Sequence, residues 1–181
     1  MINFQVEYIQ TSMNMDKKDP FQRLSKLLEE QGELLEAYFE NGDIIDTIEE
    51  AIDNLLVTSS IAYVIDHDSL IEMESIFSFN YQVNSICNVD KELIKFTIKT
   101  GKISDAVQKY LKVGASCYKG DISKEDTLLE IKDAIVILSN IIKTLVNSLA
   151  LEKFEYVNAI IEKKNKKWLE KSIYGQKIVV A

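Results

Sequence analysis

Apolar residues recur at spacings of three and four along most of this chain, a pattern typical of amphipathic α-helices. The clearest run spans residues 21–40 and contains Leu24, Leu27, Leu28, Leu34, Leu35, Tyr38 and Phe39. Asp19 fits the N-cap of this helix, and Pro20 fits its first turn, where a missing N–H is not needed. Asn41-Gly42 then provides a suitable helix end.

The same periodicity predicts five more helices joined by short connections. They cover about residues 43–66, 69–88, 90–113, 123–150 and 151–171. Only one proline and six glycines occur among the 181 residues, so long helices meet few breakers. We therefore expect an all-α fold, a bundle of about six or seven helices with a four-helix core, in a single domain over residues 1–181.

Four pairs of short segments resemble each other in the same order along the chain. The first pair is NFQVEYI at residues 3–9 and NYQVNSI at residues 80–86. The other pairs match residues 29–37 with 98–106, 41–44 with 119–122, and 50–53 with 130–133. Matches in one consistent order predict two fused helical units, about residues 1–78 and 79–175.

Composition narrows the class of protein. Hydrophobic residues make up 46% of the chain, which is enough to bury a core. The net charge of −8 argues against a protein that grips nucleic acid, because phosphate contacts need clustered Lys and Arg. No apolar stretch approaches the ~20 residues of a membrane span, and the first residues lack a signal-peptide pattern. We expect a cytoplasmic protein with neither nucleic acid nor membrane as a partner.

Cysteine and histidine offer little material for chemistry. Cys87 and Cys117 are isolated in the sequence, and His67 is the one histidine. These residues match no zinc pattern and no Ser-His or Cys-His arrangement. Any catalytic group is therefore expected among the acidic residues.

Acidic residues form two pairs with the same three-residue spacing, Glu30 with Glu33 and Glu50 with Asp53. Residues i and i+3 share one helix face, and the short Asn41-Gly42 connection favours antiparallel helices, so the two pairs can face each other. Four carboxylates brought together repel one another unless a cation joins them. An all-oxygen site without His or Cys suits Mg²⁺, with Mn²⁺ as a substitute.

These acids also have a simpler interpretation. Most charge runs are the solvated faces of helices, and Glu29, Glu36 and Glu49 extend the two runs. The shared spacing, and the apolar neighbours of Glu30 and Asp53, favour the metal site. From periodicity alone, both interpretations stay open.

The stretch KLLEEQGELLEA, followed by IEEAIDNLL, resembles the two signature helices of MazG-like and dimeric dUTPase-type enzymes. Their pattern, Glu-x-x-Glu and then Glu-x-x-Asp, is matched by Glu30, Glu33, Glu50 and Asp53 within about residues 21–65. The resemblance implies Mg²⁺-dependent hydrolysis of a nucleoside triphosphate to the monophosphate and pyrophosphate. It also implies that the four acids bind the metal, and that Glu30 or Glu33 orients and deprotonates the attacking water.

The same resemblance implies further substrate contacts. The segment LEKFEYVNAIIEKKNKKW looks like the final helix of that family, which makes Lys163, Asn165 and Lys167 candidates for binding phosphate or nucleoside. Asn54, beside Asp53, is a candidate for binding the sugar or the base. A basic helix end that complements the macrodipole accounts for the lysines equally well.

The second unit departs from the family pattern. Lys99 and Lys102 stand where the first unit has its first acidic pair, whereas Glu130 and Asp133 keep the other pair. Ammonium groups cannot replace carboxylate ligands, so we predict one metal site per chain. Our hypothesis for the second unit is that it replaces the partner subunit of a simpler dimer and lends Lys99 or Lys102 to the triphosphate. Solvated lysines are the alternative.

Two non-catalytic functions compete with hydrolysis. The chain could be an acidic helical interaction protein in which Lys99 and Lys102 mark a decayed site, or a regulator that binds the triphosphate without turning it over. The preferred base, the phosphorus attacked and the number of metal ions stay open. The family implies a homodimer, although a fused repeat also suffices as a monomer.

Overall fold

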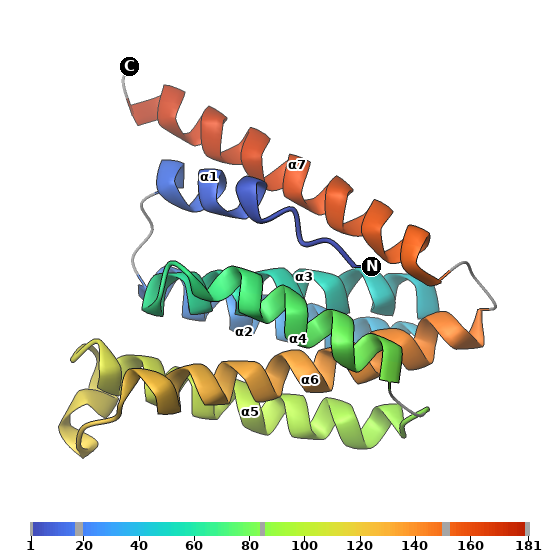
Figure 1. Ribbon diagram of the computed structural model, residues 1–181, viewed down its shortest axis with the longest axis horizontal. Coiled ribbons are helices and arrows are strands. Elements are labelled where there is room, and N and C mark those ends of the chain that lie inside the picture. Colours follow the sequence, from blue (N-terminus) through green and yellow to red (C-terminus); the bar gives the residue numbers. More distant parts are fainter. Residues whose placement is uncertain (1, 17–19, 84–85, 150–152, 180–181) are drawn as a thin grey trace.

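Seven α-helices make up most of this computed structural model, which describes residues 2–16, 20–83, 86–149 and 153–179 (Figure 1). The helices are α1 (Val6–Asp16), α2 (Pro20–Glu36), α3 (Ile44–Ile65), α4 (Ser69–Val83), α5 (Val89–Tyr110), α6 (Lys124–Ser148) and α7 (Lys153–Val179). A π-helical turn, η1 (Ala37–Asn41), follows α2, and a 3₁₀ turn, η2 (Ala115–Lys119), follows α5. The described residues contain no strand, so the prediction of an all-α bundle is confirmed.

Four long helices, α2, α3, α5 and α6, form the core of the bundle. α3 packs against α2 and α6, and α5 packs against α6. Every residue from Ala51 to Tyr63 is buried, which makes α3 the central helix. Removing this apolar surface from water is the main force that holds the bundle together. Within the described ranges, none of the helices is both long and apolar enough to cross a membrane.

Helices α1 and α7 lie side by side as a further layer against the core (Figure 1). The segment before α1 is fastened to α7, because Asn165 Nδ2 donates to the backbone oxygen of Phe4 at 2.8 Å and the N–H of Asn3 donates to Asn158 Oδ1 at 2.8 Å. Phe4 is fully buried beneath this contact. The two ends of the chain therefore stabilise one layer, which packs against α3.

The turn between α2 and α3 follows the sequence signals. Gly42 has a φ of 63°, a left-handed conformation that glycine adopts without strain. Asp43 caps α3, since its carboxylate accepts hydrogen bonds from the N–H groups of Ile45 at 2.9 Å and Asp46 at 3.1 Å. Pro20 begins α2 as predicted, while Asp19, the predicted cap of α2, lies outside the described residues.

The helix predicted over residues 69–88 is shorter than expected. It ends at Val83, and Asn88 instead caps α5 by accepting a hydrogen bond from the N–H of Lys91 at 2.9 Å. The prediction of a helix through Asn88 is therefore wrong, because an asparagine amide bonds nearby backbone groups better at a cap than inside a helix. Periodicity also fails to predict α1.

The ends of α5 and α7 also differ from the predicted bounds, since α7 continues to Val179 and not only to residue 171. α5 ends at Tyr110 rather than Val113, and the chain turns away through Gly114, which has a φ of 72°. α6 ends at Ser148, and its predicted end at Ala150 lies outside the described residues. The first pair of repeat segments takes two structures, since residues 3–5 precede α1 whereas residues 80–83 end α4.

Candidate metal centre

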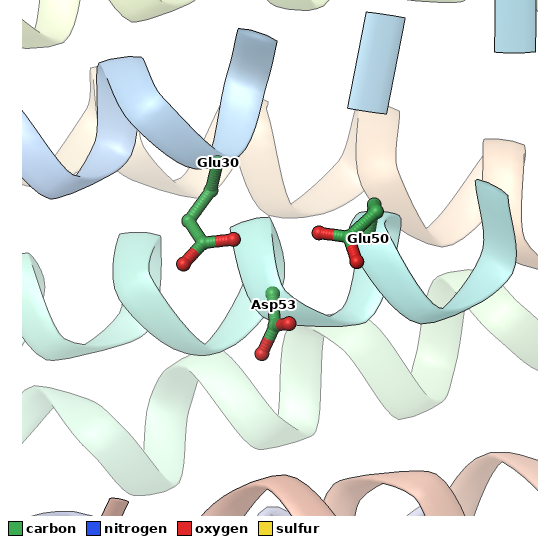
Figure 2. Close-up of side chains that lie close together, drawn as sticks. All are labelled: Glu30, Glu50 and Asp53. Carbon is green, nitrogen blue, oxygen red and sulfur yellow. The ribbon is translucent and has the colours of Figure 1, made fainter. Parts of the chain in front are cut away.

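Three carboxylates meet between α2 and α3. Figure 2 shows Glu30 on α2 near Glu50 and Asp53, which lie about one turn apart on α3. One oxygen atom from each side chain lies within 4.8 Å of the other two. Glu33 is exposed and does not belong to this group. The structure thus brings together three of the four predicted metal ligands.

Asn54 joins the two helices directly behind the carboxylates. Its amide nitrogen donates to the backbone oxygen of Glu30 at 2.7 Å and to that of Glu50 at 2.9 Å. Asn54 is fully buried. It therefore positions the two ligand-bearing turns against each other, and its side chain does not face a solvent-accessible substrate site.

Two ammonium groups flank the carboxylates. Lys26, one turn before Glu30 on α2, forms an ion pair with Glu30. Lys164 on α7 donates to Asp53 and lies 3.9 Å from Glu50 Oε1. Lys164 is only 6% exposed, so its ammonium group is buried beside the carboxylates and is largely shielded from solvent.

Some carboxylate oxygens remain without partners. Glu30 Oε2 and Glu50 Oε2 are buried and accept no hydrogen bond from any described residue. A buried charged oxygen without a partner is unfavourable, and hard oxygen donors are the ligands that Mg²⁺ and Mn²⁺ prefer. Glu30, Glu50 and Asp53 therefore fit a divalent cation.

The three acids are held where ionisation is unfavourable. Burial is the largest cause that raises the pKa of Glu50, which reaches about 7, and the charges of Asp53 and Glu30 act in the same direction. Burial also raises the pKa of Glu30 and that of Asp53. Hydrogen bonds from Lys26 and Lys164 oppose these two shifts without cancelling them. A divalent cation relieves this mutual repulsion.

The predicted substrate-binding residues of α7 occupy three different environments. Lys163 is exposed and donates to both carboxylate oxygens of Glu49 at 3.3 Å. Asn165 is buried and holds the N-terminal segment, as described above. Lys167 is exposed, and its charge lowers the pKa of Asp53.

The two lysines of the second unit belong to α5. Lys99 Nζ forms ion pairs with Glu130 at 2.6 Å and Asp133 at 2.9 Å. Lys102 is exposed on the same helix. The ammonium of Lys99 is thus committed to carboxylates of its own unit.

Lys164 and Lys26 are absent from the residues predicted from the sequence. A signal for Lys164 exists, because it continues the buried stripe of α7. Ile161 follows Val157 by four residues, and Lys164 follows Ile161 by three. A lysine in an apolar stripe needs a buried acidic partner. For Lys26, the signal is its position one turn before Glu30.

Comparisons of this chain with protein-family models, curated proteins and solved structures find no match. The resemblance to MazG-like enzymes rests on the signature residues alone. The function of this chain therefore has to follow from the chemistry of the three carboxylates and the lysines beside them.

Proposed function

We propose that this chain is a Mg²⁺-dependent nucleoside triphosphate pyrophosphohydrolase, with Mn²⁺ as an alternative cation. The observation that supports this most is the buried group Glu30, Glu50 and Asp53, in which two oxygens lack partners. Carboxylates can bind the magnesium ion of a magnesium triphosphate, and the neighbouring ammonium groups can bind its phosphates. The products are the nucleoside monophosphate and pyrophosphate.

Glu30, Glu50 and Asp53 would hold the cation. When bound, it would neutralise charge on the phosphate oxygens, including the charge that develops as the P–O bond breaks. Lys164 and Lys26 already lie against these acids. As the triphosphate binds, their ammonium groups exchange carboxylate partners for phosphate oxygens and so orient the substrate.

Glu33 acts as the general base in this proposal. It lies on the same helix face as Glu30, it is exposed, and it is outside the three-carboxylate group, so water can reach its oxygens. Glu33 takes a proton from water while the water oxygen bonds to phosphorus. The bridging P–O bond between the α and β phosphates breaks, and its electron pair stays on the leaving group. Such bases typically contribute a factor of ~10²–10⁴ in rate.

Pyrophosphate release from a panel of canonical and modified nucleoside triphosphates tests the proposal. Native protein should release pyrophosphate only with Mg²⁺ or Mn²⁺, and Glu50→Gln should abolish release by removing a ligand charge. Glu33→Gln should keep cation binding and lower kcat by roughly 10²-fold. Glu130→Gln is the matched control, because Glu130 is the corresponding acid of the second unit; this variant should retain activity.

One observation favours a second candidate function. Lys26 and Lys164 pair with Glu30 and Asp53 directly, so much of the charge is balanced without any cation. A charge-balanced cluster suits an acidic helical protein that binds a partner and catalyses nothing. In that case native protein would release no pyrophosphate, and Mn²⁺ would leave its unfolding temperature unchanged.

A further inference from the structure

The helix pair α5–α6 repeats the register of α2–α3. Each second helix begins with a capping residue, and four residues later a buried threonine donates its hydroxyl to the backbone oxygen of that cap, at 2.6 Å in α3 and 2.8 Å in α6. The acid pair follows at the same spacing in both helices. The matched residues are Asp43, Thr47, Glu50 and Asp53 in α3 and Ser123, Thr127, Glu130 and Asp133 in α6.

The first helices of the two pairs match as well. A glycine lies two residues after Glu30 in α2 and two residues after Lys99 in α5. Fully or almost fully buried residues flank both positions at the same distances. These are Leu27 and Leu34 around Glu30, and Phe96 and Ile103 around Lys99. Lys99 is therefore the counterpart of Glu30.

The Lys99 ammonium bridges the two acids of α6. Its Nζ lies 2.6 Å from Glu130 Oε2 and 2.9 Å from Asp133 Oδ2. The Lys99 side chain is 13% exposed, although Asp133 is 52% exposed. One positive charge is thus held between the acids that correspond to Glu50 and Asp53.

We infer that the Lys99 ammonium takes the place of a divalent cation in the second helix pair. The ammonium of Lys99 is the cation of the α5–α6 pair. This pair is therefore stable without a metal ion and binds no divalent metal. The inference depends on the matched geometry of the two helix pairs and does not require hydrolysis at the first. It assigns Lys99 to Glu130 and Asp133, and not to the triphosphate.

The test is the substitution Lys99→Glu, which recreates the ligand set of the first helix pair. Mn²⁺ binding, measured by electron paramagnetic resonance of the free ion, should rise by one ion per chain relative to native protein. The new site should bind Mn²⁺ more weakly than the first, because Asp133 is half exposed. Without Mn²⁺ the variant should unfold at a lower temperature than native protein, and Mn²⁺ should restore that temperature.

Two further variants make the result specific. Lys95→Glu changes the charge equally, one turn earlier on α5, where Lys95 pairs with Glu92 at 2.6 Å; it should gain no Mn²⁺ site. Lys99→Met removes the ammonium without adding a ligand, so its unfolding temperature should fall and Mn²⁺ should not restore it.

The outcomes separate this inference from the proposed function. An unchanged Mn²⁺ count in Lys99→Glu, or an equal gain in Lys95→Glu, would overturn the inference. If native protein binds no Mn²⁺ and Lys99→Glu binds one, the inference holds and the proposed hydrolase site fails.

Discussion

The carboxylate of Glu50 lies between α2 and α3, close to two other acids and to the ammonium of Lys164. Its neighbours have opposite effects on its pKa, because the charges of Asp53 and Glu30 raise the pKa of Glu50 while the charge of Lys164 lowers it. Burial decides the balance and raises the pKa of Glu50 to about 7. In the protein without metal, Glu50 therefore carries its proton over much of the range in which an unfolded glutamate has lost it.

This difference predicts how stability depends on pH in the presence of a chelator. The folded state binds the Glu50 proton more tightly than the unfolded state, so the stabilisation is complete below the ordinary pKa of 4.5 and is lost as pH rises through about 7. With a discount for partial exposure, the loss is about 2 kcal/mol, or roughly 4–8 °C in unfolding temperature. Thermal unfolding from pH 5 to 8 measures it. Glu50→Gln should flatten the slope, while the exposed Glu40→Gln should not; a slope equal in both variants would contradict the assignment.

In the proposed site, Lys164 would compete with a metal ion for Asp53 and would bind the triphosphate once the substrate is present. Lys164→Met should therefore strengthen Mn²⁺ binding in the absence of nucleotide and raise the KM for the triphosphate, each by roughly tenfold, the effect of about 1.4 kcal/mol. Titration calorimetry and steady-state kinetics measure the two effects. Lys166→Met is the control, because Lys166 is exposed and pairs with Glu162 at 3.0 Å. Weaker Mn²⁺ binding in Lys164→Met would argue against competition.

The sequence suffices to single out the acids, but not the lysine that faces them. Glu30, Glu50 and Asp53 lie on neighbouring helices joined by a short turn, so local spacing predicts their meeting. Lys164 is 111 residues from Asp53, and its contact depends on how α7 is rotated about its axis. Lys163, Lys164 and Lys167 are all basic, so charge alone does not show which of them faces inward. The periodic burial along α7 is what identifies Lys164.

At the scale of elements, the amide of Asn54 fixes how α2 sits against α3. Its two hydrogen bonds to backbone oxygens, at 2.7 and 2.9 Å, join the turns that carry Glu30 and Glu50. We expect the convergence of the carboxylates to depend on this contact, since a small shift between the helices would separate their oxygens. Asn54 thus contributes both to stability and to the arrangement of the three-carboxylate group.

Asn54→Ala should lower the free energy of unfolding by about 1–3 kcal/mol, because it removes buried hydrogen bonds and leaves a small cavity. Mn²⁺ affinity should fall with it. Urea denaturation and metal titration measure the two effects. Thr58→Val is a matched control one turn later on α3, where the fully buried hydroxyl has no partner among the described residues; this variant should be at least as stable as native protein. Unaltered Mn²⁺ binding by Asn54→Ala would contradict its positioning role.

Sequence signals predict helices well where capping and burial agree. Asp43 caps α3 and Gly42 ends the turn before it, both as their residue types suggest. They fail where one signal is weak. The apolar stripe of α1 is narrow, with Ile9 and Met13 as the buried apolar residues among those whose burial is described. The apolar residues Ile86 and Cys87 hide the capping role of Asn88.

At the scale of the whole molecule, the helix pairs α2–α3 and α5–α6 differ in where the lysine beside their acidic residues comes from. The α5–α6 pair contains Lys99, whereas the α2–α3 pair is completed from outside by Lys164 of α7. The repeated segments predict the matching of the pairs, but not the layer of α1 and α7, because that layer depends on contacts between the two ends of the chain. This layer makes the two halves chemically unequal.

The proposed hydrolysis requires that Glu30, Glu50 and Asp53 bind a divalent cation. Crystals grown with Mn²⁺ and a non-hydrolysable triphosphate analogue test it most directly, through an anomalous difference map. We expect a Mn²⁺ peak bonded to these three carboxylates, with the Lys164 ammonium moved from Asp53 to a phosphate oxygen. A map without a peak at this position under saturating Mn²⁺, with Lys164 still paired to Asp53, would contradict it.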